Sequence, residues 1–144
     1  MQLGQLSEAA LYTNDLAAAE RFYHGVLGLE IVSSFAGRGM SFRCGATVLL
    51  LFDPARTRIP DAGVPTHGAT GEGHIAFVID NSEIAPWRKR LQEAGVAIES
   101  EVEWPEGGRS LYFRDPAGNV VELAPPTLWR RNAPPLTTSP TLGL

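Results

Sequence analysis

The feature that most limits the fold of this chain is an internal repeat. From Glu8 a strand-like segment is followed by a helical pattern, a glycine and the β-rich run LEIV. The same order starts again at His74 and leads through a helical pattern and a glycine to the run VAIE. The two spans are nearly equal in length. This spacing predicts two β-α-β-β-β modules in tandem, residues 6–52 and 73–124.

Each module contains one amphipathic helix. Asp15 is the expected N-cap of the first helix, because its side chain can accept from free backbone N–H groups, and Gly28 suits the left-handed position past its end. Ser82 is the expected cap of the second helix, which ends before Gly95. Each helix should cover one sheet face and leave the other to line a cavity. The predicted fold class is α+β, a curved mixed sheet around a cavity with helices on its outer face.

At 144 residues the chain has the ordinary size of one domain, spanning 1–144. Residues 53–72 form a linker rich in proline and glycine and without periodicity, which we expect to lie over the mouth of the cavity. Residues 125–144 form a proline-rich tail whose composition favours disorder. Packing of this tail on a second subunit is a hypothesis.

Composition excludes several classes of function. The formal net charge is -4 and the basic residues are scattered, so we expect no nucleic-acid partner. The sequence has no apolar run approaching 18 residues and no charged segment followed by an apolar one near its start, so we expect neither a membrane span nor a signal peptide. The single cysteine, Cys44, cannot form an internal disulfide, and it is expected to be a small buried hydrophobe. A cytoplasmic location is the default expectation.

Residues 109–124 read as a hairpin. Asp115, Pro116, Ala117 and Gly118 suit a type I turn between two short β-rich arms. In the second arm Glu122 alternates with Val121 and Leu123, so its side chain lies on the opposite face from theirs. A carboxylate in such a row of small residues needs a partner.

Alternation also predicts which side chains enter the cavity. Glu8 and Tyr12 share a face of the first strand, and His74 should occupy the matching place in the strand that opens the second module. Aligning the modules through the glycines at positions 45 and 118 makes Leu49 the residue of the first module that is equivalent to Glu122. A leucine cannot bind a metal.

Three stretches resemble the vicinal oxygen chelate superfamily, which includes glyoxalase I, extradiol dioxygenases, fosfomycin thiol transferases and bleomycin-binding proteins. They are the DP-x-GN turn with the Glu122 that follows it, the run GHIAFV from Gly73, and the run LSEAALYTNDLAAAERFY from Leu6. The resemblance runs from about residue 6 to residue 124. It implies that Glu122 and His74 are metal ligands and that Glu8 is the third.

Two positions depart from that family's pattern. The first-strand position, usually His or Gln, is Glu8, and the fourth position, a Glu in glyoxalase I, is apolar. Three ligands, Glu8, His74 and Glu122, are similar in number to those of the dioxygenases and thiol transferases. Hard oxygen ligands favour Mn²⁺, Fe²⁺ or Mg²⁺, and the imidazole keeps Ni²⁺ and Zn²⁺ possible. Open positions on the metal would take two adjacent oxygens of a small-molecule substrate.

Alternative interpretations remain for individual residues. Glu8 could be an exposed residue of an edge strand, and His74 a satisfied histidine at a strand end. His67, in the linker, reads as a surface residue or as an acid or base that reaches the cavity, and His24 suits a helix end. The candidate contacts to an anionic or phenolic substrate are Tyr12, Arg43, Tyr112 and Arg114.

Three functions are compatible with these residues. The first is a metal-dependent enzyme of the glyoxalase or dioxygenase type, in which Glu122 and Glu8 would be catalytic. The second is a metal-free protein that sequesters a drug, similar to the bleomycin-binding members. The third is an epimerase or fosfomycin thiol transferase. By analogy with the family we expect a homodimer.

Overall fold

The computed structural model describes residues 3–61 and 63–129. The chain forms two compact units. The first unit consists of Met1–His74 and Asp115–Val120, and the second of Ile75–Arg114 and Val121–Leu144. The turn of the final hairpin is therefore part of the first unit, although both of its arms run through the second sheet.

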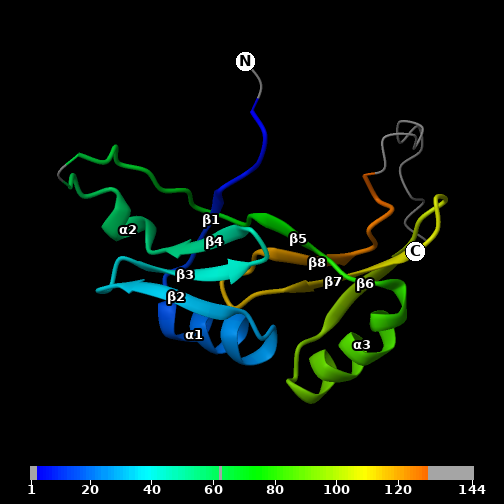
Figure 1. Ribbon diagram of the computed structural model, residues 1–144. Coiled ribbons are helices and arrows are strands. Elements are labelled where there is room, and N and C mark those ends of the chain that lie inside the picture. The colour runs from blue at the N-terminus through cyan, green and yellow to red at the C-terminus, as the bar shows by residue number, and fades with distance from the viewer. Residues whose placement is uncertain (1–2, 62, 130–144) are drawn as a thin grey trace. The chain divides into compact units, whose positions relative to one another are not determined.

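The predicted repeat is confirmed by two four-stranded mixed sheets with the same strand order (Figure 1). The first sheet has the order β1-β4-β3-β2, with β1 parallel to β4 and antiparallel pairing elsewhere. The second has the order β5-β8-β7-β6, with β6 antiparallel to β7. The bounds are β1 (Glu8–Tyr12), β2 (Glu30–Phe35), β3 (Gly39–Cys44), β4 (Thr47–Phe52), β5 (His74–Val78), β6 (Ile98–Glu103), β7 (Arg109–Arg114) and β8 (Val120–Ala124).

Matching backbone hydrogen bonds fix which residues of the two modules are equivalent. Val48 N–H donates to Ser7 O at 3.0 Å, and Val120 N–H donates to Gly73 O at 2.9 Å. At the other strand ends, the N–H groups of residues 13 and 79 donate to the carbonyls of residues 52 and 124. Counting inward from both pairs makes Glu8 equivalent to His74, as the alternation predicts. The same bonds show that β5 and β8 run in the same direction.

The expected equivalence of Leu49 and Glu122 is wrong, because the hydrogen bonds pair Leu50 with Glu122. The segment from Gly45 to the first bonded residue is one residue longer than the segment from Gly118, so the two glycines are not in register. In the parallel pair of β1 and β4, Leu49 lies beside Ala9 and Leu50 lies beside Ala10. Leu50 therefore shares the face of Glu8, and the fourth position remains apolar.

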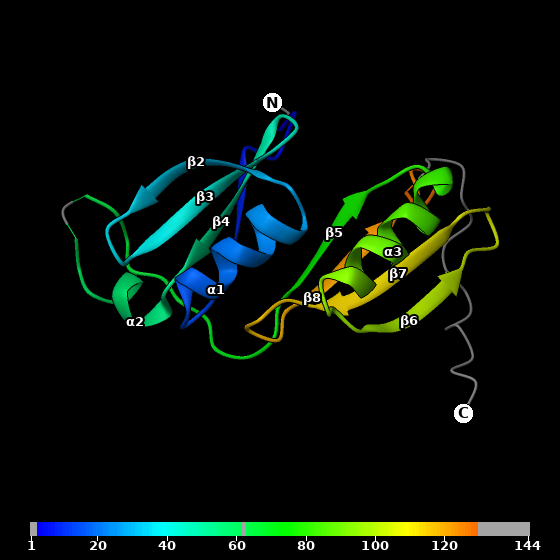
Figure 2. The same ribbon diagram turned by 90° about the horizontal axis from the view of Figure 1, so that it is seen from below.

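One helix covers one face of each sheet (Figure 2). In the first module α1 (Leu16–Glu20) continues into a π-helical segment, η1 (Arg21–Val26). The Asp15 cap is confirmed, since its Oδ1 accepts from Ala18 N–H at 2.9 Å, and Gly28 has the expected positive φ of 77°. No helix in the part of the chain that the structure describes is long and apolar enough to cross a membrane.

The second helix starts earlier than the sequence suggests. A 3₁₀ turn, η2 (Asn81–Glu83), precedes α3 (Ile84–Glu93), and the prediction of Ser82 as cap is wrong. Asp80 forms a capping box with Glu83, whose Oε2 accepts from Asp80 N–H at 2.7 Å. This reciprocal arrangement satisfies two backbone donors at once, which a single serine hydroxyl cannot do.

The core of each unit lies between its helix and the covered sheet face. Leu49, Leu51 and Phe42 are nearly inaccessible in the first unit, as are Leu111 and Phe113 in the second. Burying one such side chain contributes about 1.5–3 kcal/mol. The face that each helix covers therefore stabilises the fold. We call the opposite face of each sheet, away from its helix (Figure 2), the open face, and its residues can differ between the modules.

The linker is more ordered at its start than its composition indicates. Asp53 caps a one-turn helix, α2 (Pro54–Thr57), by accepting from Ala55 N–H at 2.8 Å. Thr57 is fully buried and its carbonyl accepts from His67 N–H at 3.2 Å. Most of the tail, residues 130–144, lies outside the described residues, and so does its expected packing on a second subunit. In the described part, Thr127 Oγ1 donates to Gly107 O at 2.7 Å.

Candidate functional site

Glu122 is a buried carboxylate on the open face of the second sheet. Its side chain is only 4% exposed. Ser110 Oγ donates to Glu122 Oε1 at 2.7 Å, and the Tyr112 hydroxyl donates to the same oxygen at 2.8 Å. Ser110 and Tyr112 alternate along β7 with the core residues Leu111 and Phe113, so their side chains lie away from α3. The carboxylate thus has the partners that its position requires.

Both donors are neutral hydroxyls, and their bonds orient the Glu122 carboxylate. Burial and the hydrogen bond to Glu122 raise the pKa of Tyr112 above its ordinary value of 10.0. Its hydroxyl therefore keeps its proton at neutral pH and remains a donor to Glu122.

Sequence reasoning missed two members of this cluster, Ser110 and Trp104. Trp104 Nε1 donates to Ser110 Oγ at 2.7 Å, and Ser110 is fully buried. The hairpin could have indicated Ser110, because residues on either side of a turn oppose each other in order. Trp104 carries no such signal. It reaches the sheet because a tight turn folds back there, with Gly107 N–H bonded to Trp104 O at 2.9 Å.

Glu8 and His74 are both exposed and lie on the outer strands of their sheets, at equivalent positions. Glu8 belongs to the first unit and Glu122 to the second. Across residues 3–61 and 63–129, the structure brings no three His, Cys, Asp or Glu side chains together as a group that could hold a metal. The three residues fit a divalent ion in their chemistry, since they offer one imidazole and two carboxylates. Glu122 also has the hydroxyl bonds that commonly orient a ligating carboxylate.

The predicted substrate contacts differ in their surroundings. Arg43 is exposed and pairs with Val48, the partner of Glu8, so it lies in the same row of the open face. Arg114 Nε instead donates to both carboxylate oxygens of Glu99, at 3.0 and 3.1 Å. Its guanidinium is thus engaged at the edge of the second sheet.

Tyr12 is linked to the histidine of the linker. Its hydroxyl lies 2.8 Å from His67 Nδ1, and the His67 ring meets the edge of Phe52 with a centroid distance of 5.0 Å. Phe52 in turn stacks on Phe35. His67 is therefore held against the open face of the first sheet rather than projecting from a loop.

A pocket of about 390 Å³ lies beside Tyr12 in the first unit. Its walls come from the end of β1, the start of α1, the linker and the turn of the final hairpin. The lining residues are Tyr12, Thr13, Asn14, Asp15, Pro54, Ala69, Thr70, Gly71, Glu72, Pro116 and Ala117. The linker thus lines a pocket.

The turn of the hairpin is fixed by a second buried carboxylate, Asp115. Its Oδ1 accepts from the N–H groups of Ala117 and Asn119, and its Oδ2 accepts from the Tyr23 hydroxyl and Asn119 Nδ2, all at 2.8–2.9 Å. Asn119 also accepts from Gly73 N–H and donates to Tyr12 O. We call Tyr23, Asp115 and Asn119 the turn clasp. Burial and the charge of Asp115 raise the pKa of Tyr23 far above 10.0.

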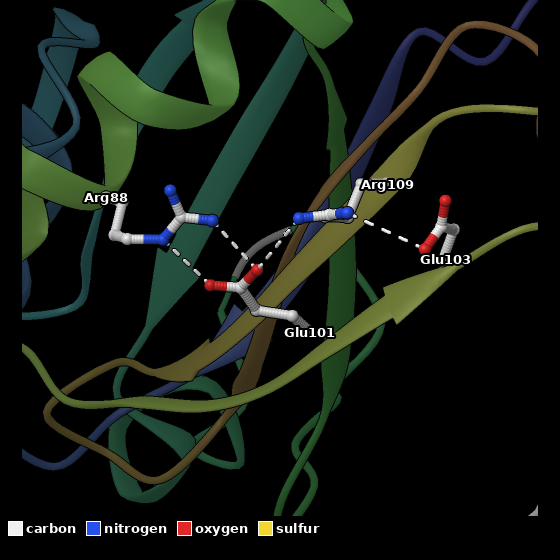
Figure 3. A network of polar contacts seen from close by, with 4 residues as sticks. All are labelled: Arg88, Glu101, Glu103 and Arg109. Carbon is white, nitrogen blue, oxygen red and sulfur yellow. Dashed lines mark hydrogen bonds and ion pairs between the residues drawn. The ribbon is translucent and has the colours of Figure 1, made fainter.

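A separate polar network lies at the edge of the second unit (Figure 3). Arg88 of α3 forms two hydrogen bonds of 2.8 Å with Glu101, and Arg109 lies within ion-pair distance of Glu101 and Glu103. The hydrogen bonds from Arg88 hold the pKa of Glu101 below its ordinary value of 4.5. Arg88 lies on α3, and its partners lie on β6 and β7. The network therefore connects α3 to the sheet, and its two positive and two negative charges balance.

Comparisons with known proteins agree on one family. Residues 5–123 match the model described as the Glyoxalase/Bleomycin resistance protein/Dioxygenase superfamily. Glutathione transferase FosA of Serratia marcescens is 31% identical over 125 residues, covering 84% of this chain and 80% of that protein. Biphenyl-2,3-diol 1,2-dioxygenase 3 of Rhodococcus globerulus is 31% identical over 128 residues, covering 83% of this chain and 62% of that protein.

The solved structures include a lactoylglutathione lyase from Agrobacterium tumefaciens with a TM-score of 0.85. It is 42% identical in sequence, and the match covers 90% of this chain and 98% of that chain.

Proposed function

Because the chain belongs to the glyoxalase, bleomycin resistance protein and dioxygenase superfamily, we propose that it is a metal-dependent enzyme acting on a small molecule bound through two adjacent oxygens. The observation that carries this proposal is Glu122. A carboxylate that is buried on an open sheet face and oriented by two neutral hydroxyls is suited to bind a cation.

Glu8, His74 and Glu122 are the proposed metal ligands, and Glu122 and Glu8 the proposed catalytic carboxylates. Two carboxylates and one imidazole suit Mn²⁺, Fe²⁺ or Mg²⁺, and also Ni²⁺ or Zn²⁺. Such an ion supplies Lewis-acid polarisation of the substrate oxygens. The Tyr112 hydroxyl donates to Glu122, and Tyr112 is a further proposed contact to the substrate. Tyr12 and Arg43 would bind the substrate from the open face of the first sheet, and Arg114 would do so only by exchanging its bond to Glu99.

The proposed substrate class is supported by two relatives whose names contain glutathione, the transferase and the lyase. We therefore favour a reaction on a thiol adduct or with a thiol as co-substrate. Leu50 at the fourth position distinguishes the proposed centre from that of glyoxalase I. The reaction is tested by offering the hemithioacetal of methylglyoxal and glutathione, fosfomycin with glutathione, and a catechol with oxygen.

A second candidate, sequestration of a drug without a metal, is favoured by one observation. Tyr12, Phe35, Phe52 and His67 form an aromatic row on the open face of the first sheet. Such a row suits a flat or cationic ligand. Tight binding of such a ligand by metal-free protein, without turnover, would select this function.

The proposal also includes a homodimer in the cytoplasm. The dimer rests on analogy within the family, and the location on the lone cysteine. Sedimentation equilibrium tests the dimer, with a mass of one chain as the contrary result.

Metal content tests the main proposal. Protein purified without chelator or affinity-column metal is assayed by mass spectrometry, beside Glu122→Ala and the matched variant Glu101→Ala, which removes an exposed carboxylate of the same unit. We expect stoichiometric metal in the parent and in Glu101→Ala, and its loss in Glu122→Ala. Absence of metal from the parent, even after incubation with Mn²⁺, Fe²⁺, Ni²⁺ and Zn²⁺, would contradict the enzymatic function.

A further inference from the structure

The ring of His67 lies on the open face of the first sheet, although the residue belongs to the linker. Its Nδ1 is 2.8 Å from the Tyr12 hydroxyl. The ring also stands at 67° to the ring of Phe52, with the two centroids 5.0 Å apart. His67 therefore joins the linker to the sheet through a hydrogen bond and an aromatic contact.

The sheet is shaped to receive a flat ring at this place. Tyr12 is the pairing partner of Phe52, and Gly39 is the partner of both Phe52 and Phe35, so all four lie in one line across the strands. A Cβ at Gly39 would clash with the Phe52 ring and with Leu51 O. Because Gly39 has none, the Phe52 ring extends over β3 and stacks on Phe35 at an interplanar angle of 27°.

The linker around His67 is held with little burial. In residues 63–72, His67 and Gly68 are partly buried and the others are exposed. A segment that buries so little surface opens locally at a low cost in free energy. The His67 ring can therefore leave Phe52 while the sheet beneath it stays folded.

We propose that His67 is a latch: its imidazole occupies a site on the first sheet for a small planar ring, and a ligand of this class binds by displacing it. The imidazole indicates what the site recognises, a flat ring against Phe52 and an atom at the ring edge that hydrogen-bonds to the Tyr12 hydroxyl. A phenol meets both conditions. The inference goes beyond the proposed function, because it concerns the first unit alone and requires neither a metal nor a reaction.

The first test asks whether His67 holds the linker. In the parent, the backbone N–H of His67 donates to Thr57 O. Hydrogen exchange of the full chain, freed of metal with a chelator, measures the protection factor of this amide. We expect the factor to be about 10-fold lower in His67→Ala, because the hydrogen bond and the aromatic contact are both lost. Tyr12→Phe removes the same hydrogen bond from the other side and should also lower it.

His24→Ala is the matched control. It removes an exposed histidine whose Nδ1 lies 2.8 Å from Leu29 O, and the protection of residue 67 should not change. A thermal unfolding curve for each variant establishes that it is folded. Parent-like protection in folded His67→Ala and Tyr12→Phe would overturn the latch.

The second test measures the ligand. Phenol is titrated into the metal-free protein, with cyclohexanol as a non-planar alcohol of similar size. The chain has three tyrosines, so ring-labelled tyrosine gives three sets of NMR signals, and Tyr12→Phe identifies those of Tyr12. Phenol should shift the Tyr12 signals and leave those of the buried Tyr23 in place. It should bind His67→Ala about 10-fold more tightly than the parent, because the imidazole no longer competes.

Cyclohexanol should bind neither protein measurably. Equal phenol affinity in the parent and His67→Ala, binding that leaves the Tyr12 signals unchanged, or no binding by either protein would overturn the inference. These outcomes are separate from those of the metal assay. A parent without metal would contradict the proposed function and leave this site standing.

Discussion

Each unit contains a tyrosine that donates to a buried carboxylate, and the two carboxylates differ in their other bonds. In the turn clasp, the Tyr23 hydroxyl donates to Asp115, and the bonds to this carboxylate are shared between both of its oxygens. In the second unit, the hydroxyls of Ser110 and Tyr112 both donate to Glu122 Oε1. The carboxylate of Asp115 accepts from two backbone N–H groups and so fixes a turn, whereas the bonds from Ser110 and Tyr112 join Glu122 to side chains of the neighbouring strand.

The largest effect is expected where a carboxylate is introduced at a buried apolar position. Leu50 occupies the position of Glu122 in the first module and is 9% exposed. Leu50→Glu should lower the free energy of unfolding by about 3–5 kcal/mol, because the new charge is buried and the hydroxyl of its cross-strand neighbour Ser41 is already bonded to Ser33. Urea denaturation measures the change. Val32→Glu, at an exposed strand position, should cost far less, and an equal loss in both variants would contradict the role of the donors.

Breaking the turn clasp should have the next largest effect. Asp115→Ala removes the acceptor of four hydrogen bonds and leaves the Tyr23 hydroxyl buried without its acceptor. We expect a loss of about 2–4 kcal/mol in the free energy of unfolding. A double-mutant cycle with Tyr23→Phe measures the coupling between the two residues. Additive losses would show that Tyr23 and Asp115 do not stabilise each other.

Alkaline pH should reduce the contribution of Tyr23 and Tyr112 to the free energy of unfolding. The pKa values of Tyr23 and Tyr112 are raised above 10.0, so above pH 10 the unfolded chain loses these protons while the folded chain keeps them. Their contribution to stability is complete below pH 10 and is lost as the pH rises. The expected slope is about 1.4 kcal/mol per pH unit for each tyrosine that stays protonated.

Tyr23→Phe and Tyr112→Phe separate these contributions. Each variant should show a shallower loss of stability between pH 10 and the onset of unfolding. Chemical denaturation at a series of pH values measures the slopes. A variant whose slope equals that of the parent would show that its tyrosine titrates alike in the folded and unfolded chain.

The smallest effect on stability is expected at Glu122 itself. Glu122→Gln keeps an oxygen that can accept from Ser110 and Tyr112, so the free energy of unfolding should change by about 1 kcal/mol or less. Metal affinity should fall strongly in the same variant. A large loss of stability would instead make Glu122 a structural carboxylate like Asp115.

Much of this architecture is readable from local sequence. The repeat, the Asp15 cap and Gly28 follow from spacing and from backbone preferences that act over a few residues. The hairpin also places Tyr112 and Ser110 near Glu122, because its arms oppose each other in order. The assignment of Glu8, His74 and Glu122 as metal ligands remains a prediction.

The predictions fail where the position of a residue depends on one residue of loop length or on a contact with a distant part of the chain. One extra residue after Gly45 moves the equivalent of Glu122 from Leu49 to Leu50. The contact between His67 and Tyr12 joins residues 55 positions apart, and no local pattern specifies it. The contact between Trp104 and Ser110 likewise depends on the turn that brings Trp104 back to the sheet.

The turn clasp also limits the order in which the chain can be completed during synthesis. Tyr23 and Asp115 are separated by 92 residues, and Asn119 supplies the bonds to Tyr12 and Gly73. On the ribosome, the first module emerges long before these partners exist. Its hydrogen bonds are complete only when almost all of the second module has followed, so the N-terminal unit must wait for the C-terminal hairpin before it reaches its full stability.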